Sequence, residues 1–257
     1  MRAIAYELSD MWVLAVRSAK RIRRQPDLLI GFTVQPLMFV LLFVYVFGGA
    51  ISTPGFSYVD FLIPGIIVQT MAFGGFVTAL GLSEDLKKGL MDRFRSLPMS
   101  RSAVLTGRTL ADVSTNVVQL VVVLGVGLLV GFSFRTGAAD IAAGIALLLL
   151  IGYSFSWVFA FVGLAASSPE AANAYGFTIL FPLTFVSSAF VPVRSMPSWL
   201  QPVAENNPFT IMVNAVRGLF LGIPVGNDVW LAVAWSVGIA VVCAALAIWR
   251  YRRVVAK

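Results

Sequence analysis

Six apolar stretches, each long enough to cross a bilayer as a helix, constrain this chain more than any other sequence feature. They run from Leu28 to Gly49, Val59 to Leu82, Leu110 to Gly131, Ile141 to Ala166, Ala174 to Val193 and Val229 to Trp249. The pattern predicts an all-α membrane protein whose six transmembrane helices occupy residues 28–250. The fifth stretch is the least regular because Pro182 and Pro192 interrupt it.

Composition excludes several classes of protein. Hydrophobic residues make up 59% of the chain and charged residues 12%, whereas a soluble domain is about half apolar and about a quarter charged. Histidine is absent and Cys243 is the single cysteine. These counts exclude Ser-His-Asp and Cys-His nucleophiles and His-ligated metal sites, so we predict no catalytic residue and no metal site.

Residues 1–27 are amphipathic and basic. Ile4, Leu8 and Trp12 recur at helical spacing, while Arg17 and Lys20 fall on the other side. This pattern is typical of a cytoplasmic helix that lies in the membrane interface. A solvated run of charges is the alternative that the sequence leaves open.

Basic residues predict the orientation of the chain. Sixteen of the 19 Lys and Arg residues lie in residues 1–27, in the 83–109 loop and in the tail from Arg250 to Lys257. Because basic loops stay cytoplasmic, both termini of this multi-pass chain are expected in the cytoplasm, with residues 251–257 as a basic tail. Topology and anionic lipid account for the net charge of +7, so no nucleic-acid partner is predicted.

The 83–109 loop carries an apolar stripe among charges. Leu86, Leu90, Phe94 and Leu97 share one face of a short predicted helix, which Pro98 ends. That face packs on the chain's own amino-terminal helix, on lipid or in a groove of a partner. The loop alone does not distinguish these alternatives.

The external region, residues 194–228, contains an apolar helix that is too short to span. Ile211 to Leu221 fits an external re-entrant or interfacial helix. Arg217 lies within it and needs a partner. Glu205 and Asp228 are the nearest external acids, and the sequence does not choose between them.

An energy source within the chain is not evident. A P-loop needs a Gly-Lys pair, and none occurs among the four lysines. Asp60 and Asp112 lie at the ends of predicted spans, whose middles hold no acid. Ion-coupled carriers usually keep an ionisable group at membrane depth, so ion-driven transport is disfavoured and any energy is expected from another subunit.

Neutral polar residues and phenylalanines within the spans allow two interpretations each. Gln35, Gln69, Asn116 and Gln119 either form interhelical hydrogen bonds or contact a ligand. The phenylalanines of the first span either pack against other helices and lipid or form an aromatic wall for an apolar compound.

At its two long loops the chain resembles the permease subunits of type-2 ABC exporters, most closely the daunorubicin/doxorubicin-resistance branch. The similarity is carried by Gly89 to Arg101 with Ala103 to Arg108, and by Phe61 to Gly65 in the second span. The external stretch is the most specific part, and it comprises Phe181 to Phe185, Ala189 to Pro192, Met196-Pro197 and Glu205 to Pro208.

The resemblance implies a division of labour between chains. Two permease chains, identical or related, would form the transmembrane unit in the bacterial cytoplasmic membrane, and two P-loop ATPase subunits would bind Mg-ATP beneath it. This chain would itself hold no cofactor. By match, Asp92, Arg93, Phe94, Arg95, Leu97 and Pro98 would contact the ATPase.

The resemblance also implies site residues within the membrane. The substrate cavity would be lined by Gln35, Phe39, Phe43, Thr70, Phe73, Thr184 and Ser188. The external gate would include Asn207, Pro208 and Arg217. The expected function is ATP-driven export of hydrophobic or amphipathic compounds, drug-like or lipid-like. The alternative is a non-transporting scaffold or sensor that anchors a cytosolic partner.

Overall fold

The computed structural model describes residues 26–49, 51, 53, 55–87 and 101–255, and all the regular structure within these ranges is helical. The predictions for residues 1–25 and 88–100 lie outside the described residues. The elements are α2 (Pro26–Leu41), η1 (Leu42–Phe47), α3 (Tyr58–Phe73), α4 (Phe76–Lys87), α6 (Arg101–Leu129), α7 (Ala138–Ala165), α8 (Pro169–Phe185), η2 (Val193–Ser195), α9 (Gln201–Glu205), α10 (Pro208–Leu221) and α11 (Asp228–Val255).

Four of the six predicted spans are confirmed as helices long and apolar enough to cross a membrane. They are Tyr58–Lys87, Leu105–Leu129, Ala138–Ala165 and Asp228–Arg253. The fifth stretch forms a shorter helix, because α8 has 17 residues. In the first stretch, α2 and the π-helix η1 follow each other without a break over residues 26–47.

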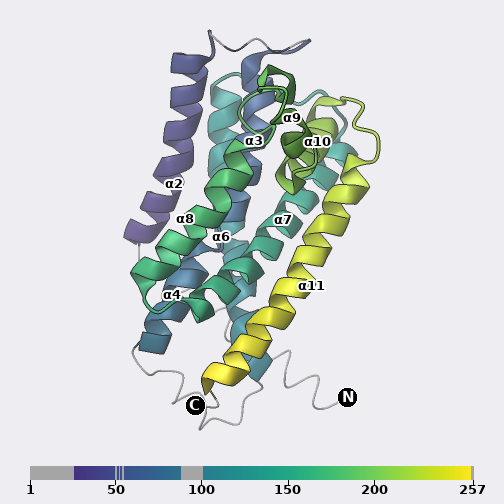
Figure 1. Cartoon of the computed structure of the whole chain (residues 1–257). Helices are drawn as coiled ribbons and strands as arrows, with labels where there is room; N and C mark the ends of the chain where they lie inside the picture. Colours follow the sequence, from purple (N-terminus) through teal and green to yellow (C-terminus); the bar gives the residue numbers. More distant parts are fainter. Residues whose placement is uncertain (1–25, 50, 52, 54, 88–100, 256–257) are drawn as a thin grey trace.

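The long helices run between two ends of the molecule. In Figure 1, α4, the start of α6, the α7–α8 turn and the end of α11 lie at the lower end. The α6–α7 connection, α9 and α10 lie at the upper end (Figure 1). Lys87, Arg250, Arg252 and Arg253 belong to helix ends of the lower side.

Local capping residues explain where several helices begin. The Ser57 hydroxyl accepts from the Asp60 N–H at 3.2 Å at the start of α3, and that of Ser168 accepts from the Ala171 N–H at 3.2 Å at the start of α8. Pro169 follows Ser168 in the first turn, where its missing N–H costs nothing. These caps fix the ends of the helices independently of their apolar pattern.

Helix α7 is central and α3 is the most deeply buried element. Helix α7 packs against α3, α4, α6, α10 and α11. In the most apolar part of the Tyr58–Lys87 span 94% of the residues are buried, against 17% in the corresponding part of α11. The α3 side chains Leu62, Ile66 and Met71 are fully buried. A helix that is hydrophobic all round is typical of such a core position.

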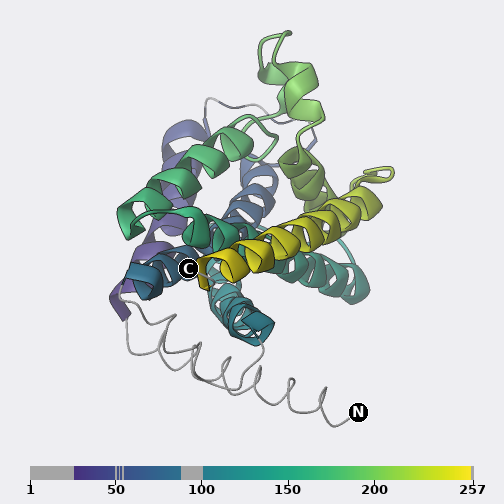
Figure 2. The same ribbon diagram turned by 60° about the horizontal axis from the view of Figure 1, so that its bottom comes forward.

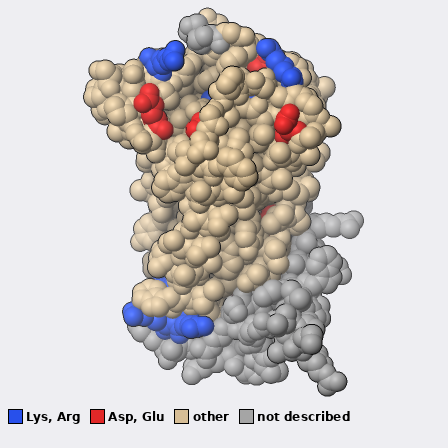
Figure 3. Space-filling model, turned by 90° about the vertical axis from the view of Figure 1, so that its right-hand side faces the viewer, with Lys and Arg blue, Asp and Glu red and all other residues tan. Residues whose placement is uncertain are grey.

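The two flanks of the bundle differ. Figure 2 shows α2 and α8 on one side of the molecule and α11 on the other. Helix α11 leaves Trp230, Trp235, Val241 and Trp249 exposed. On this face Figure 3 shows a broad belt with almost no charged side chains between two charged ends. Tryptophans near both ends of an exposed apolar helix are typical of membrane interfaces.

The Tyr58–Lys87 span contains a break within its length. The chain turns at Gly74–Gly75 between α3 and α4. A Cβ at Gly74 would overlap the Asn116 side chain, and one at Gly75 would lie 2.7 Å from Ser156 Cα. Helices α6 and α7 therefore approach α3 and α4 closely at this break, which only glycine permits.

Candidate functional site

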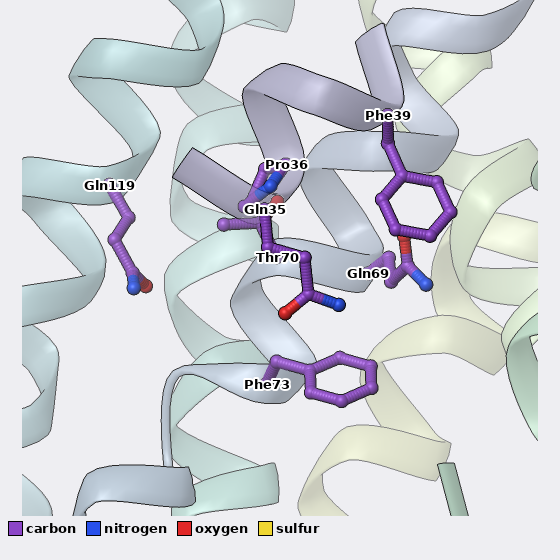
Figure 4. Close-up of a pocket in the computed structure, with 7 residues that line it drawn as sticks. All are labelled: Gln35, Pro36, Phe39, Gln69, Thr70, Phe73 and Gln119. Carbon is purple, nitrogen blue, oxygen red and sulfur yellow. The ribbon is translucent and has the colours of Figure 1, made fainter. Parts of the chain in front are cut away.

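A narrow cleft lies between α2, α3 and α6. It is called the three-amide cleft below. Its lining is Gln35, Pro36 and Phe39 from α2, Gln69, Thr70 and Phe73 from α3, and Gln119 from α6. Figure 4 shows these side chains on the three helices, with Gln119 of α6 set apart from the other six. All seven are uncharged, so the cleft offers amides, a hydroxyl and aromatic rings.

Two amides of the cleft have unused hydrogen-bonding atoms. Gln69 is 5% exposed and Gln119 2% exposed. Among the described residues, Gln69 Nε2 and Gln119 Oε1 have no partner, whereas the Thr70 hydroxyl donates to the Ile66 carbonyl at 2.7 Å. Buried polar atoms are normally paired because leaving one unpaired costs free energy. Both unpaired atoms are themselves buried beside the cleft.

A continuous row of phenylalanines runs beside the cleft. Successive ring centroids are 4.8 to 5.4 Å apart along Phe47, Phe43, Phe190, Phe185, Phe181, Phe177, Phe76 and Phe159. We call this row the phenylalanine ladder. Spacings of this size are those of favourable aromatic pairs.

The ladder is partly exposed on the flank formed by α2 and α8. Phe47 and Phe185 are each 42% exposed, and Tyr45, Tyr175 and Ile179 are exposed near them in the sequence. The sequence left packing and an aromatic wall as alternatives for the first-span phenylalanines. In the structure the inner rings pack in the core and the outer rings form surface, and the aromatic wall for a compound stays a prediction.

At the upper end, α8 stops at Phe185 and the chain continues without α-helix to Pro192. The predicted end of this span at Val193 is therefore wrong. Asn207 Nδ2 donates to the carbonyls of Leu183 and Val186 at 2.8 and 2.6 Å. Asn207 Oδ1 also accepts from the Phe209 N–H at 2.9 Å, which caps α10. The Asn207 side chain thus binds carbonyls at the end of α8 and caps the start of α10.

Arg217 of α10 binds the same non-helical segment. Its Nε donates to the Phe61 carbonyl at 2.9 Å, and its Nη2 donates to the carbonyls of Ser188 and Ala189. Its Nη1 donates to the Ser188 hydroxyl and to Asn214 Oδ1, both at 3.2 Å. The guanidinium lies 3.6 Å from the Phe61 ring centroid. These partners are carbonyl and side-chain oxygens and a ring face, rather than the expected Glu205 or Asp228.

We call this arrangement of residues 183–192 with α3 and α10 the external junction. The Tyr58 hydroxyl donates to the Phe190 carbonyl at 2.9 Å, and the Thr210 hydroxyl accepts from the Ser188 N–H at 3.1 Å. Gly65 faces Ala189 so closely that a Cβ would overlap its carbonyl. Non-helical backbone at membrane depth needs such internal partners because lipid supplies none.

A comparison with known families decides the class of this protein. Residues 9–221 match the family model described as ABC-2 type transporter. This chain belongs to the ABC-2 type transporter family. It is a transmembrane permease subunit of an ABC transporter.

Relatives of this permease carry names that concern drug resistance and transport. The daunorubicin resistance ABC transporter permease protein DrrB1 of Streptomyces coeruleorubidus is 35% identical over 97% of this chain and 87% of its own length. The probable doxorubicin resistance ABC transporter permease protein DrrC of Mycobacterium tuberculosis is 28% identical over 87% and 81%. The putative transport permease ycf38 of Cyanophora paradoxa is 30% identical over 83% and 74%.

The structure of this permease brings some predicted cavity residues together. Gln35, Phe39, Thr70 and Phe73 share the three-amide cleft, and Phe43 is in the adjacent ladder. Two predicted cavity residues lie elsewhere. Thr184 is buried, with its hydroxyl donating to the Leu180 carbonyl of its own helix, and Ser188 lies in the external junction.

The predicted gate residues Asn207, Pro208 and Arg217 all lie at the external junction. The predicted coupling residues Asp92, Arg93, Phe94, Arg95, Leu97 and Pro98 lie outside the described residues. The structure describes the flanks of that loop, where α4 continues to Lys87 and α6 begins at Arg101.

Asp112 is not at a helix end, which corrects the sequence-based placement. Helix α6 begins well before the predicted span, and its apolar part starts at Leu105. Asp112 is 3% exposed and lies near Thr78 of α4 and Ser156 of α7. The span boundary was misplaced because Arg101 and Arg108 interrupt the apolar pattern without ending the helix. The expectation that no acid lies buried within a span is therefore wrong for Asp112.

Sequence reasoning also missed a polar stripe along α6. Its members are Arg108, Asp112, Thr115, Asn116 and Gln119. Arg108 pairs with Asp85 of α4 at 2.6 Å. The stripe was visible in principle, since these positions recur at the three- and four-residue spacing of one helix face. Interpreting each residue singly concealed it.

Proposed function

We propose that this permease exports hydrophobic or amphipathic compounds, using ATP hydrolysed by separate partner subunits. The observation that carries the proposal is the three-amide cleft beside the phenylalanine ladder, on the flank formed by α2 and α8. Aromatic surface with a few polar groups is typical of sites for amphipathic ligands. The drug-resistance names of the relatives support this substrate class.

The proposed assembly contains two copies of a P-loop ATPase, each binding Mg-ATP, and a second permease chain, identical or related. The coupling contact would be made by the 83–109 loop through residues 92–98. The neighbouring α4 and α6 support this, because the Arg108–Asp85 ion pair and α7 join them to the membrane core. A push on the loop would therefore reach the helix that carries Gln119.

The proposed layout has six spans, with α2–η1 as the first and α8 as the fifth, and α9–α10 as external re-entrant helices. Helix directions in Figure 1 fit it, because successive long elements alternate between the two ends. The lower end would be cytoplasmic. Lys87, Arg250, Arg252 and Arg253 support this orientation, since basic residues favour the cytoplasmic side.

For export, ATP binding must shift the permease from a conformation whose cavity opens to one side of the membrane to a conformation whose cavity opens to the other side. Moving a two-state equilibrium from 1:99 to 99:1 needs about 5.5 kcal/mol of differential binding. Closure of two ATPase subunits on ATP would supply this bias. The external junction would be the element that opens or closes toward the outside.

The first test is a mild-detergent pull-down of the tagged chain from its native membranes, followed by mass spectrometry. Near-stoichiometric recovery of a P-loop ATPase is expected. Recovery of intact permease at good yield without any ATPase would contradict the proposal and favour the scaffold function.

A second test addresses coupling. Arg93→Glu is expected to abolish drug export by cells and ATPase recovery, because it reverses a charge in the proposed contact. Arg135→Glu reverses a charge at the other end of the molecule and is the matched control. Because Arg135 pairs with Asp60 at 2.7 Å, this control is scored for ATPase recovery alone. Unchanged export by an inserted Arg93→Glu permease would refute the coupling assignment.

A further inference from the structure

The lower end of α11 carries basic side chains at the edge of its apolar, exposed flank. Arg252 and Arg253 lie in the last turn of the helix and are exposed. Figure 3 shows blue side chains and no red ones on the described surface at the lower end of this face. Within the described part of the chain, neither arginine forms an ion pair with Asp or Glu. These two charges are therefore available to an anionic partner.

An apolar stripe leads along α11 to one of these arginines. Val242, Leu246, Trp249 and Arg253 follow one another at four-, three- and four-residue spacing, so they share one face of the helix. The three apolar members of the stripe are exposed. From Val242 to Arg253 the helix rises about 16 Å, roughly half the thickness of the hydrocarbon core of a bilayer. The stripe therefore matches the acyl chain of a lipid in one leaflet.

Trp249 positions Arg253 for a phosphate group. The guanidinium carbon of Arg253 lies 4.1 Å from the centroid of the Trp249 ring. Stacking uses the face of the guanidinium, so the N–H groups along its edge remain able to donate hydrogen bonds. Such an edge can bind two oxygens of one phosphate. Tryptophan is enriched at the depth of the lipid headgroups, which is where the phosphates of a bilayer lie.

Packing against other helices fixes the end of α11 before any ligand binds. Tyr251 is 3% exposed and belongs to a buried cluster with Leu105 of α6 and Leu164 of α7. Beside it, Arg250 Nε donates to the Leu164 carbonyl in the last turn of α7 at 3.3 Å. A ligand at this end therefore need not order the helix, which reduces the entropy cost of binding.

The helix dipole favours basic residues in a last turn, but it does not account for this arrangement. The dipole acts on every face of the turn, whereas Arg253 continues the exposed apolar stripe and stacks on its tryptophan. An anionic phospholipid offers both an acyl chain for the stripe and a phosphate for the arginines. A zwitterionic phospholipid carries a cation beside its phosphate, which offsets part of the attraction.

We propose that the lower end of α11 binds an anionic phospholipid. Its acyl chain lies along Val242 and Leu246, its headgroup lies level with Trp249, and Arg252 and Arg253 donate to its phosphate. This site lies across the molecule from the α2–α8 flank (Figure 2), and it gives a ligand to a flank to which the proposed export function assigns none.

The test uses the full chain purified in non-ionic detergent, with lipid binding titrated by native mass spectrometry. Dioleoyl phosphatidylglycerol is the anionic probe. Dioleoyl phosphatidylcholine has the same chains with a zwitterionic head, and glycerol 3-phosphate has a phosphate without chains. We expect phosphatidylglycerol to bind at least about tenfold more tightly than phosphatidylcholine, since two basic residues attract its charge. Glycerol 3-phosphate at equal concentration should not displace it.

Variants locate the headgroup. Arg252→Gln and Arg253→Gln each remove one charge, so each should weaken phosphatidylglycerol binding by about fivefold, the value of one basic residue near anionic lipid. The double variant should bind the two lipids about equally. Arg194→Gln is the matched control, because Arg194 is exposed in η2 and lies outside this site. It should keep the native selectivity, and thermal unfolding verifies that each variant is folded.

Four results would overturn the inference. The first is equal affinity of the native chain for the two lipids. The second is full selectivity for phosphatidylglycerol in the folded double variant, which would assign the arginines to a protein partner such as the ATPase. The third is the same loss of selectivity in Arg194→Gln as in Arg253→Gln. The fourth is displacement by glycerol 3-phosphate, which would indicate a site for free phosphate. If the double variant fails to fold, the single variants decide by the same comparison.

Discussion

At the scale of single residues, Arg217 is the main organising side chain of the upper end. It is 4% exposed and donates to carbonyls from α3 and from the segment after α8. Its neutral partners show that it supplies donors to free carbonyls rather than pairing with an acid. The charge is shared among several oxygens and the Phe61 ring, which offsets part of its burial cost.

Arg217→Met should destabilise the permease strongly. The substitution leaves buried carbonyls of Phe61, Ser188 and Ala189 without donors, and we expect a loss of about 2–5 kcal/mol. Arg217→Lys should lose less, because it keeps donors but not the fork geometry. Thermal unfolding in detergent measures both. Equal stability of Arg217→Met and the native chain would show that the junction does not depend on these bonds.

Gly65→Ala tests the close approach of α3 to the external junction. The added methyl group would overlap the Ala189 carbonyl, so we expect destabilisation of about 1–3 kcal/mol. Gly125→Ala on α6 is the control, since no atom of the described residues lies within 4 Å of the Cβ it would gain. That variant should be neutral or slightly stabilising. The comparison is made by unfolding midpoints, and equal destabilisation of the two variants would contradict the packing.

At the scale of elements, the break between α3 and α4 lets α6 and α7 pack closely against it. Asn116 of α6 is fully buried and lies against Gly74 at the break and Gly152 of α7. Ser156 of α7 packs against Gly75. The break therefore lets α3 face the cleft while α4 carries Asp85 toward the lower end.

A double-mutant cycle at Gly74 and Asn116 tests this arrangement. Gly74→Ala alone should cost about 1–3 kcal/mol because its methyl group collides with the Asn116 side chain. Adding Asn116→Ala should relieve the collision, giving a favourable coupling energy of about 1 kcal/mol or more. Gly75→Ala is the control, since it meets Ser156 Cα, which Asn116→Ala cannot move. Additive effects at Gly74 and Asn116 would disprove the contact.

At the scale of the whole molecule, the two flanks differ in the side chains that they expose. The α11 flank is apolar and uniformly aliphatic or tryptophan-bearing, which suits lipid. The α2–α8 flank carries the exposed part of the phenylalanine ladder and the cleft behind it. We therefore expect the second permease chain on the α2–α8 flank, so that the two ladders enclose the substrate path.

Cysteine cross-linking tests which flank meets the second chain. In a Cys243→Ser background, Ile179→Cys on α8 should form disulfide-linked dimers with an identically substituted chain in native membranes. Val242→Cys on α11 should not, although both positions are exposed. Cross-linked species are scored on non-reducing gels. Efficient dimers through Val242→Cys alone would place the interface on the α11 flank and contradict this expectation.

The sequence by itself determined the class, four of the spans and the short apolar helix. Runs of some 20 apolar residues favour membrane helices, because lipid accepts so much apolar surface and a helix pairs its own backbone. The same reasoning predicted a helix from Ile211 to Leu221, within α10 (Pro208–Leu221), and singled out Arg217, whereas Asn207 came from the resemblance to the exporter family. It also gave four residues of the cleft, through the resemblance to the exporter family.

Tertiary structure alone decided where α8 ends, what Arg217 binds and where Asp112 lies. Each depends on partners distant in the sequence, such as the Phe61 carbonyl, 156 residues from Arg217. The periodicity of a sequence shows which face of a helix is apolar. It does not show which backbone carbonyl lacks a hydrogen-bond donor, or which other helix packs against that face. Those outcomes follow from the requirement that buried backbone and polar groups find partners once the helices have packed.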